Sequence, residues 1–369
     1  MTSPPPAVPP STLVSQVKEL IQQLVRKPPI LLLIMLLTLP VMYLVVYGRG
    51  SAAGVVIIGA AAMQVITGVG GLKTGVVNAP LLSGFLALSC VVSDRPLAAG
   101  FVALAVALWA SMGAASGKGA MISMAASIMS IMLVVPPQIT HSTNPHTARN
   151  TIAVLLYALA ASAWGVVLGL LTRRGRTIPK LPRSSWQWGV TQGVLVGIVM
   201  FAVAVFATSR NLGQGGAWLL MTVYLVFKPL APTPWRRSID RAFGTLIGVG
   251  IVALYLASLP TSAPPLALLL PASLMLTGAA CTLLSQRWPY WCYVALFTPA
   301  IVLFLACTSA ATKTVPVART LDALRIEYSL LGVAIALAVQ GLLIGIDRVF
   351  PVKESKWMKS VSATPSSLS

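Results

Sequence analysis

Long runs of apolar residues recur from Ile30 to Ile346, and they constrain the fold more than any other feature of this chain. Many of them approach the roughly 20 residues that a helix needs to cross the hydrocarbon core of a bilayer. The chain is 57% hydrophobic and only 9% charged, whereas a soluble globular protein carries roughly a quarter charged residues. A single water-soluble core is therefore excluded.

The apolar runs are continuous and lack the two-residue alternation of barrel strands, so they predict helices. We expect an all-α polytopic membrane protein with about twelve transmembrane helices. The expected spans are 30–47, 51–67, 76–92, 96–113, 120–135 and 152–171 in the first half, and 189–207, 213–227, 242–259, 266–284, 290–307 and 328–346 in the second.

A basic segment divides these spans into two sets of six. The predicted units are a cytoplasmic leader (1–28), a first transmembrane half (29–171), a basic cytoplasmic linker (172–188), a second transmembrane half (189–350) and a cytoplasmic tail (351–369). Shifting one half over the other by about 165 residues pairs Gly84 with Gly248, Gly113 with Gly278 and Gly165 with Gly332. Six is an even number of crossings, so we expect two like-oriented six-helix repeats, an arrangement found among transporters.

The basic residues predict the orientation of the chain. Its formal net charge is +19, with 26 Lys and Arg residues. With a cytoplasmic N-terminus, only seven of them fall on the outer side: Arg49, Arg95, Arg149, Arg210, Lys313, Arg319 and Arg325. The positive-inside rule therefore favours a bacterial inner-membrane protein with both termini cytoplasmic. The segment 313–327 departs from this pattern, and it would turn inward if the last two spans were drawn differently.

Two interpretations of the charge stay open. The basic residues orient the chain and attract anionic lipid headgroups, or they also gather an anionic substrate at the cytoplasmic mouth of a pathway. They form no single basic face of the kind that binds nucleic acid.

Glycines interrupt the second span of each half, at ITGVGGLK in the first and NLGQGGAW in the second. Interrupted spans at matching positions of two repeats indicate a substrate site in transporters. The alternative is that these glycines lie in loops just outside the bilayer. GxxxG spacings at Gly113/Gly117, Gly165/Gly169, Gly193/Gly197, Gly244/Gly248 and Gly341/Gly345 indicate close helix packing.

The sequence shows no cluster of residues that would support catalysis. No ionisable residue lies near the middle of an expected span, and His141 and His146 share one loop without an evident carboxylate partner. There is no GxxxxGK[ST] phosphate loop. We therefore expect no enzyme activity, no cofactor and no metal site.

The second half carries a family resemblance, in the segments GGAWLLMTVYLVFKP, RRSIDRAFGTLIGVGIVALYL and ARTLDALRIEYSLLGVAIAL. From Trp218 to Ile346 the chain resembles the fusaric acid resistance protein-like and aromatic acid exporter superfamily. The element that opens the third span, Arg241-x-x-Gly244-Thr245-x-x-Gly248, is similar to that of the family. The first half lacks this element, and the chain lacks the large cytoplasmic domains of many members.

The resemblance implies an inner-membrane transporter that exports aromatic or other hydrophobic organic acids, or related toxic compounds. The alternatives are a passive anion channel and a non-transporting membrane component of an envelope complex. The expected partners are the lipid bilayer, a small organic anion, a periplasmic adaptor protein of a Gram-negative envelope and a second copy of the chain. The candidate substrate pathway combines polar residues in or near the interrupted spans, basic residues of the cytoplasmic mouth and residues of the family-like segments. It comprises Gln64, Lys73, Asn78, Gln214, Trp218, Lys228, Arg237, Arg241, Gly244 and Thr245.

Overall fold

The computed structural model describes residues 30–115, 117, 119–140, 144–174, 186–226, 234–259, 265–285, 288–309, 327–338 and 341, and these residues contain helices and no strand. The helices are α2 (Ile30–Val46), α3 (Gly50–Gly70), α4 (Leu72–Val92), α5 (Pro96–Ala115), α6 (Gly119–Val134), α7 (Ala148–Arg173), α8 (Trp186–Ser209), α9 (Gln214–Val226), α10 (Pro234–Ser258), α11 (Pro265–Ser285) and α12 (Tyr290–Ser309). A further helical segment spans Glu327–Ala338.

The lengths and apolar character of these helices make the chain a multi-pass membrane protein. Six of the described helices are long and apolar enough to cross a bilayer, and five shorter apolar helices accompany them. Most helix ends lie within about four residues of the expected ends. The exception is α10, which begins at Pro234, eight residues before the expected start at position 242.

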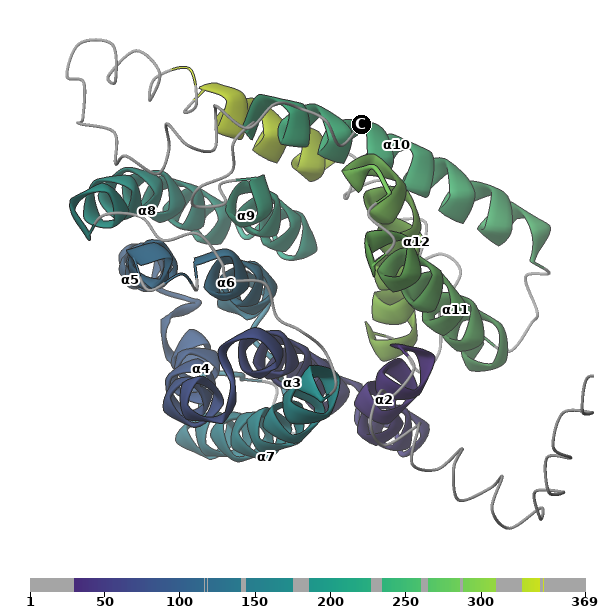
Figure 1. Ribbon diagram of the computed structural model, residues 1–369. Helices are drawn as coiled ribbons and strands as arrows, with labels where there is room; N and C mark the ends of the chain where they lie inside the picture. Colours follow the sequence, from purple (N-terminus) through teal and green to yellow (C-terminus); the bar gives the residue numbers. More distant parts are fainter. Residues whose placement is uncertain are drawn as a thin grey trace, which may run out of the picture.

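Seven helices, α3 to α9, form one bundle (Figure 1). Within it α3 packs along α7, α5 along α8 and α6 along α9. The largest hydrophobic cluster contains Ala103, Met200 and Leu220, which come from α5, α8 and α9. Helices from both expected halves therefore share this core.

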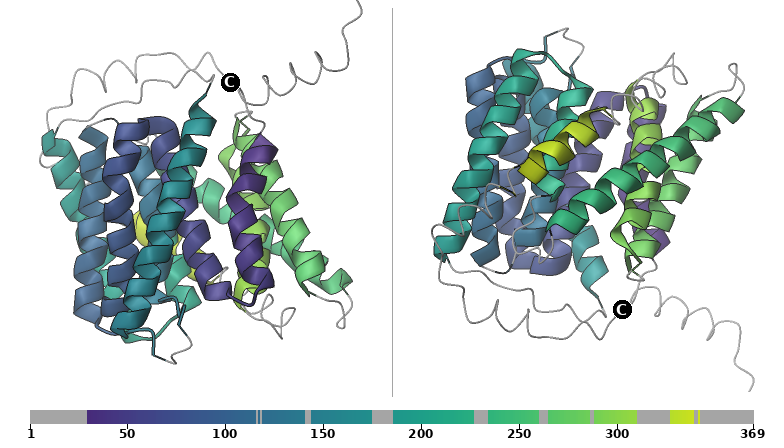
Figure 2. Two further views of the ribbon diagram at one scale, coloured as in Figure 1. Left: turned by 90° about the horizontal axis from the view of Figure 1, so that it is seen from below. Right: turned by 90° about the horizontal axis from the view of Figure 1, so that it is seen from above.

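The remaining labelled helices, α2 and α10 to α12, form a second group beside the bundle (Figure 1). Here α12 packs against both α10 and α11, and α2 contacts α11 as well as α3 and α7 of the bundle. Figure 2 shows that α10 runs obliquely across the other helices of this group. The two groups meet at α2, at the contact of α12 with α3 and at the contact of α10 with α9.

Small residues set the closest helix contacts. A Cβ atom at Gly169 of α7 would lie 2.9 Å from the Gln64 carbonyl oxygen of α3, and one at Gly248 of α10 would lie 2.8 Å from the Ala295 carbonyl oxygen of α12. On α8, a Cβ at Gly197 would meet Leu104 of α5. The prediction of close packing is confirmed for the pairs Gly165/Gly169, Gly193/Gly197 and Gly244/Gly248, whereas a Cβ at Gly341 would meet nothing within 4 Å in the described part of the chain.

The glycine interruption expected within ITGVGGLK lies at the last glycine of that stretch. Gly68 and Gly70 are helical, and the break falls at Gly71, whose φ of 81° ends α3 and allows α4 to begin at Leu72. The helix continues up to this point, and Gly68 lies against Gly169 and Thr172 of α7. In the second half, Gly213 has φ 51° just before α9. Both breaks are at helix ends.

Candidate functional site

The element Arg241-x-x-Gly244-Thr245 lies on the second and third turns of α10. Residues three and four apart share one helix face, so the three side-chain positions point the same way. That face packs against α12, where a Cβ at Gly244 would lie 2.5 Å from the Trp291 carbonyl oxygen. Glycine at this position lets the two backbones approach, and it thereby places Arg241 next to the start of α12.

Arg241 is a buried cation. Its residue is 3% exposed, and it lies inside the candidate membrane span Ser238–Ser258. Its Nη1 donates a long hydrogen bond of 3.5 Å to the Tyr290 hydroxyl. Among the described residues, its Nε and Nη2 have no hydrogen-bond partner although both are buried, and the ion pairs involve Asp94 and not Arg241.

A buried guanidinium without a charge partner is costly. An arginine stays protonated in proteins, and removing a charge from water costs several kcal/mol unless a partner compensates it. Nε and Nη2 form one edge of the guanidinium, and such an edge matches the two oxygens of a carboxylate. Arg241 can therefore bind an organic carboxylate or another oxyanion.

Thr245 extends the same face one turn further into the span. It is 1% exposed, and its Oγ1 is also buried, with no hydrogen-bond partner in the described part of the chain. Buried polar groups are normally hydrogen-bonded, so Arg241 and Thr245 both have unused hydrogen-bonding capacity on one helix face. We call Arg241, Thr245 and Tyr290 the Arg241 site.

Aromatic rings continue from this site along α12. The rings of Tyr290 and Tyr293 stack with centroids 6.0 Å apart, and those of Tyr293 and Phe297 stack at 5.1 Å. On the α10 side, Phe243 meets Trp291 edge to face at 5.4 Å. Stacked rings offer flat apolar faces that suit another aromatic ring.

Two predicted pathway residues make structural hydrogen bonds instead. The Nε2 of Gln64 donates to Thr172 Oγ1 at 3.4 Å and links α3 to α7. The Nδ2 of Asn78 donates to the Thr74 carbonyl oxygen at 2.7 Å within α4. Neither lies on α10 or α12, so the structure does not bring them to the Arg241 site.

The other predicted residues are dispersed. Lys73 is exposed on the first turn of α4, Gln214 begins α9 with a buried and unpartnered Oε1, and Trp218 is buried in α9. Lys73 and Arg241 therefore belong to separate helix groups in Figure 1. Lys228 and the side chain of Arg237 lie outside the described residues.

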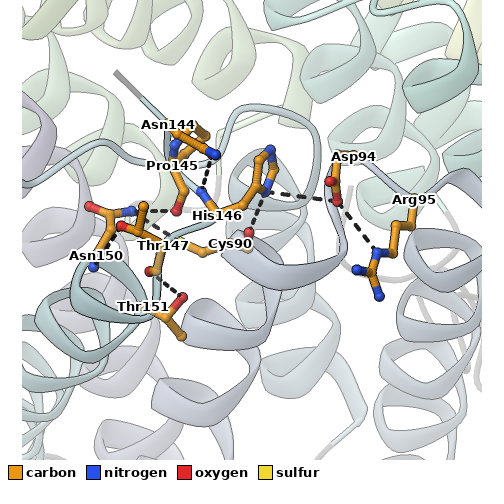
Figure 3. Close-up of polar contacts among 9 residues, drawn as sticks. All are labelled: Cys90, Asp94, Arg95, Asn144, Pro145, His146, Thr147, Asn150 and Thr151. Carbon is orange, nitrogen blue, oxygen red and sulfur yellow. Dashed lines mark hydrogen bonds and ion pairs between the residues drawn. The ribbon is translucent and has the colours of Figure 1, made fainter. Parts of the chain in front are cut away.

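A second polar cluster lies where the loop before α7 meets the end of α4 (Figure 3). The Nδ1 of His146 lies 2.6 Å from the Cys90 carbonyl oxygen and 3.8 Å from Asp94 Oδ1. The expectation that no carboxylate accompanies this histidine is wrong, because the α4–α5 turn brings Asp94 to it from a distant part of the sequence. His141 lies outside the described residues, and in the described part of the chain no group of three potential metal ligands occurs.

Asn150 holds this cluster together from the first turn of α7. Its Oδ1 accepts from the Ile139 amide at 2.8 Å, and its Nδ2 donates to the carbonyl oxygens of Pro137 and Pro145 at 2.8 Å each. The side chain thus satisfies loop backbone that would otherwise be buried without partners. The cluster is structural, and it fixes the loop onto α4 and α7.

Sequence reasoning missed the aromatic part of the Arg241 site. The spacing of Tyr290, Tyr293 and Phe297 places them on one helix face, and this pattern was a usable signal. The pairing of Tyr290 with Arg241 had no such signal, since it depends on the crossing of α10 and α12.

Comparison with known proteins bears on the second half of the chain. Residues 198–339 match the model of a family described as fusaric acid resistance protein-like. The match includes the Arg241 element and α12, and it confirms the resemblance seen in the sequence. No curated protein and no solved structure matches the chain.

Proposed function

We propose that this chain, which is fusaric acid resistance protein-like over residues 198–339, is an inner-membrane transporter that exports aromatic or other hydrophobic carboxylic acids. The observation that carries the proposal is the buried guanidinium of Arg241 inside a candidate membrane span, where two of its nitrogens have no partner among the described residues. A carboxylate that binds there would compensate the charge. The neighbouring rings of Tyr290, Tyr293 and Phe297 would receive the hydrophobic part of the substrate.

The proposal includes two like-oriented six-helix repeats with both termini in the cytoplasm, and the helix pairs support it. Corresponding helices of the two expected halves are six apart in chain order. When each helix is exchanged for its counterpart, the α5–α8 contact becomes α11–α2, and the α6–α9 contact becomes α12–α3. All four contacts are present, as a two-fold relation between the halves would require. A periplasmic adaptor protein and a second copy of the chain are the proposed partners.

Export from loaded cells tests the role of Arg241. Cells that make the full chain would be loaded with labelled benzoate, and its efflux would be followed at equal protein level. We expect Arg241→Gln to reduce efflux about tenfold or more, since a hydrogen bond to a charged group contributes about 1.5–3 kcal/mol and 1.4 kcal/mol corresponds to a factor of ten. Arg241→Lys keeps the charge but lacks the planar guanidinium, so its efflux should lie between that of the wild type and that of Arg241→Gln.

Arg95→Gln is the matched control, because Arg95 is exposed in the α4–α5 turn. It should leave benzoate efflux unchanged. Equal efflux by Arg241→Gln and Arg95→Gln at equal abundance would remove Arg241 from the mechanism. Single-channel conductance in a planar bilayer would instead indicate a passive anion channel.

A further inference from the structure

A groove of about 770 Å³ lies between α2 and α7. We call it the α2–α7 groove, and it is lined mainly by apolar side chains of these two helices, among them Pro40, Ala160 and Trp164, and by Tyr43, Tyr47 and Tyr157. It lies between α2 and the bundle, and no residue of α10 or α12 lines it. Its volume is in the range of small-molecule binding sites.

Among the described residues, none that lines the groove is charged. Its polar side-chain atoms are three tyrosine hydroxyls and the indole nitrogen of Trp164, and that nitrogen already donates to the Leu36 carbonyl oxygen at 3.1 Å. A carboxylate inside the groove would therefore lie in apolar surroundings without a compensating cation, which is strongly unfavourable. The chemistry of the groove fits an uncharged hydrocarbon chain.

The surroundings of the groove identify the source of such a chain. Leu39 is 63% exposed and Tyr43 is 62% exposed on an apolar helix, so this face of α2 meets the bilayer. Beyond Tyr47 the chain turns, and Arg49 is exposed at this end of the groove. Tyrosines and a cation at the end of an apolar groove suit the interface where lipid phosphates lie.

We propose that the α2–α7 groove is a phospholipid-binding site, in which one acyl chain lies along Pro40, Ala160 and Trp164 while the lipid phosphate lies at Arg49. The hydrogen bond from Trp164 to α2 fixes one wall of the site. A lipid bound there would stabilise the contact of α2 with the bundle. On its other contacts α2 touches α11 of its own helix group. A phospholipid fits better than a free organic acid because its charge stays outside the groove.

Native mass spectrometry of the delipidated full chain tests this assignment, with dioleoyl phosphatidylglycerol as the added probe. We expect one saturable lipid adduct on the wild-type chain. Ala160→Phe fills the groove and should weaken this adduct at least tenfold. Ala163→Phe is the matched control, because Ala163 is exposed on the same helix outside the groove, and it should bind like the wild type.

A second experiment tests the contact between the lipid phosphate and Arg49. Arg49→Gln should weaken binding of phosphatidylglycerol severalfold and leave binding of dioleoylglycerol, which has the same chains without phosphate, unchanged. If Ala160→Phe does not fold, judged by its melting temperature in lipid-free detergent, Ala160→Leu replaces it. Equal lipid binding by the Ala160 and Ala163 variants would overturn the proposal, and so would stoichiometric displacement of the lipid by benzoate.

Discussion

A hydrogen bond from Trp164 of α7 compensates for the missing amide N–H of Pro40 in α2. Proline has no amide N–H, so the Leu36 carbonyl oxygen, four residues earlier in α2, receives no helical hydrogen bond from it. Trp164 Nε1 of α7 donates to this oxygen at 3.1 Å. In an apolar membrane environment an unsatisfied carbonyl is costly, so the indole compensates for the proline.

A double-mutant cycle tests this compensation. Trp164→Phe should lower the stability of the purified chain by about 1–3 kcal/mol, the usual cost of leaving a buried polar group unpaired. Pro40→Ala restores the amide N–H, so adding it to Trp164→Phe should recover part of the loss. The measurement is the apparent melting temperature of the four proteins in one detergent. Strictly additive effects would contradict the compensation.

Single residues also show where sequence reasoning reaches its limit. The cationic character of Arg241 and the glycine one turn later are visible in the sequence, but burial of the guanidinium depends on how α10 crosses α12. The approach of Asp94 to His146 depends likewise on the fold of the loop that Asn150 holds. Chemistry carried by one helix was predictable, whereas chemistry shared between helices was not.

Helices as elements were largely predictable, because apolar runs of membrane length allow few alternatives. The start of α10 was placed too late, since Arg236, Arg237 and Arg241 resemble a loop outside the membrane. The structure continues the helix through these residues and buries Arg241 against α12. The interruption of α3 falls at Gly71, the last glycine of ITGVGGLK, because glycine is tolerated inside a helix where a neighbouring helix packs closely on it, as at Gly68.

Gly248 and Gly250 of α10 allow the effect of close packing on stability to be distinguished from the effect of helix propensity. At Gly248 a Cβ would lie 2.7 Å from Thr298 Cβ and 2.8 Å from the Ala295 carbonyl oxygen, whereas at Gly250 it would meet nothing within 4 Å. Gly248→Ala should therefore push α10 from α12 and lower the melting temperature. Gly250→Ala should leave it unchanged or raise it, since alanine favours a helix by roughly 0.5–1 kcal/mol over glycine. A matching loss in both variants would contradict the close contact.

In the whole molecule, the two expected halves are interwoven rather than separate. α8 and α9 complete the bundle of the first half, while α2 lies beside α11 and α12 of the second. The contacts related by the shift of six helices are unequal, because α5 packs along the length of α8 while α2 and α11 touch over a smaller region. The two related contacts therefore differ in how closely their helices pack.

The orientation of the whole chain can be tested at the two ends of α7. Its 26 residues span about 39 Å at 1.5 Å per residue, enough to cross the bilayer. Arg95 lies with His146 near the beginning of α7, and Arg174 follows its end. In a background with the four native cysteines replaced by alanine, Arg95→Cys should react with a membrane-impermeant maleimide on intact cells. Arg174→Cys should react only after permeabilisation, because positive-inside orientation places that end in the cytoplasm, and the reverse labelling pattern would invert the proposed direction of export.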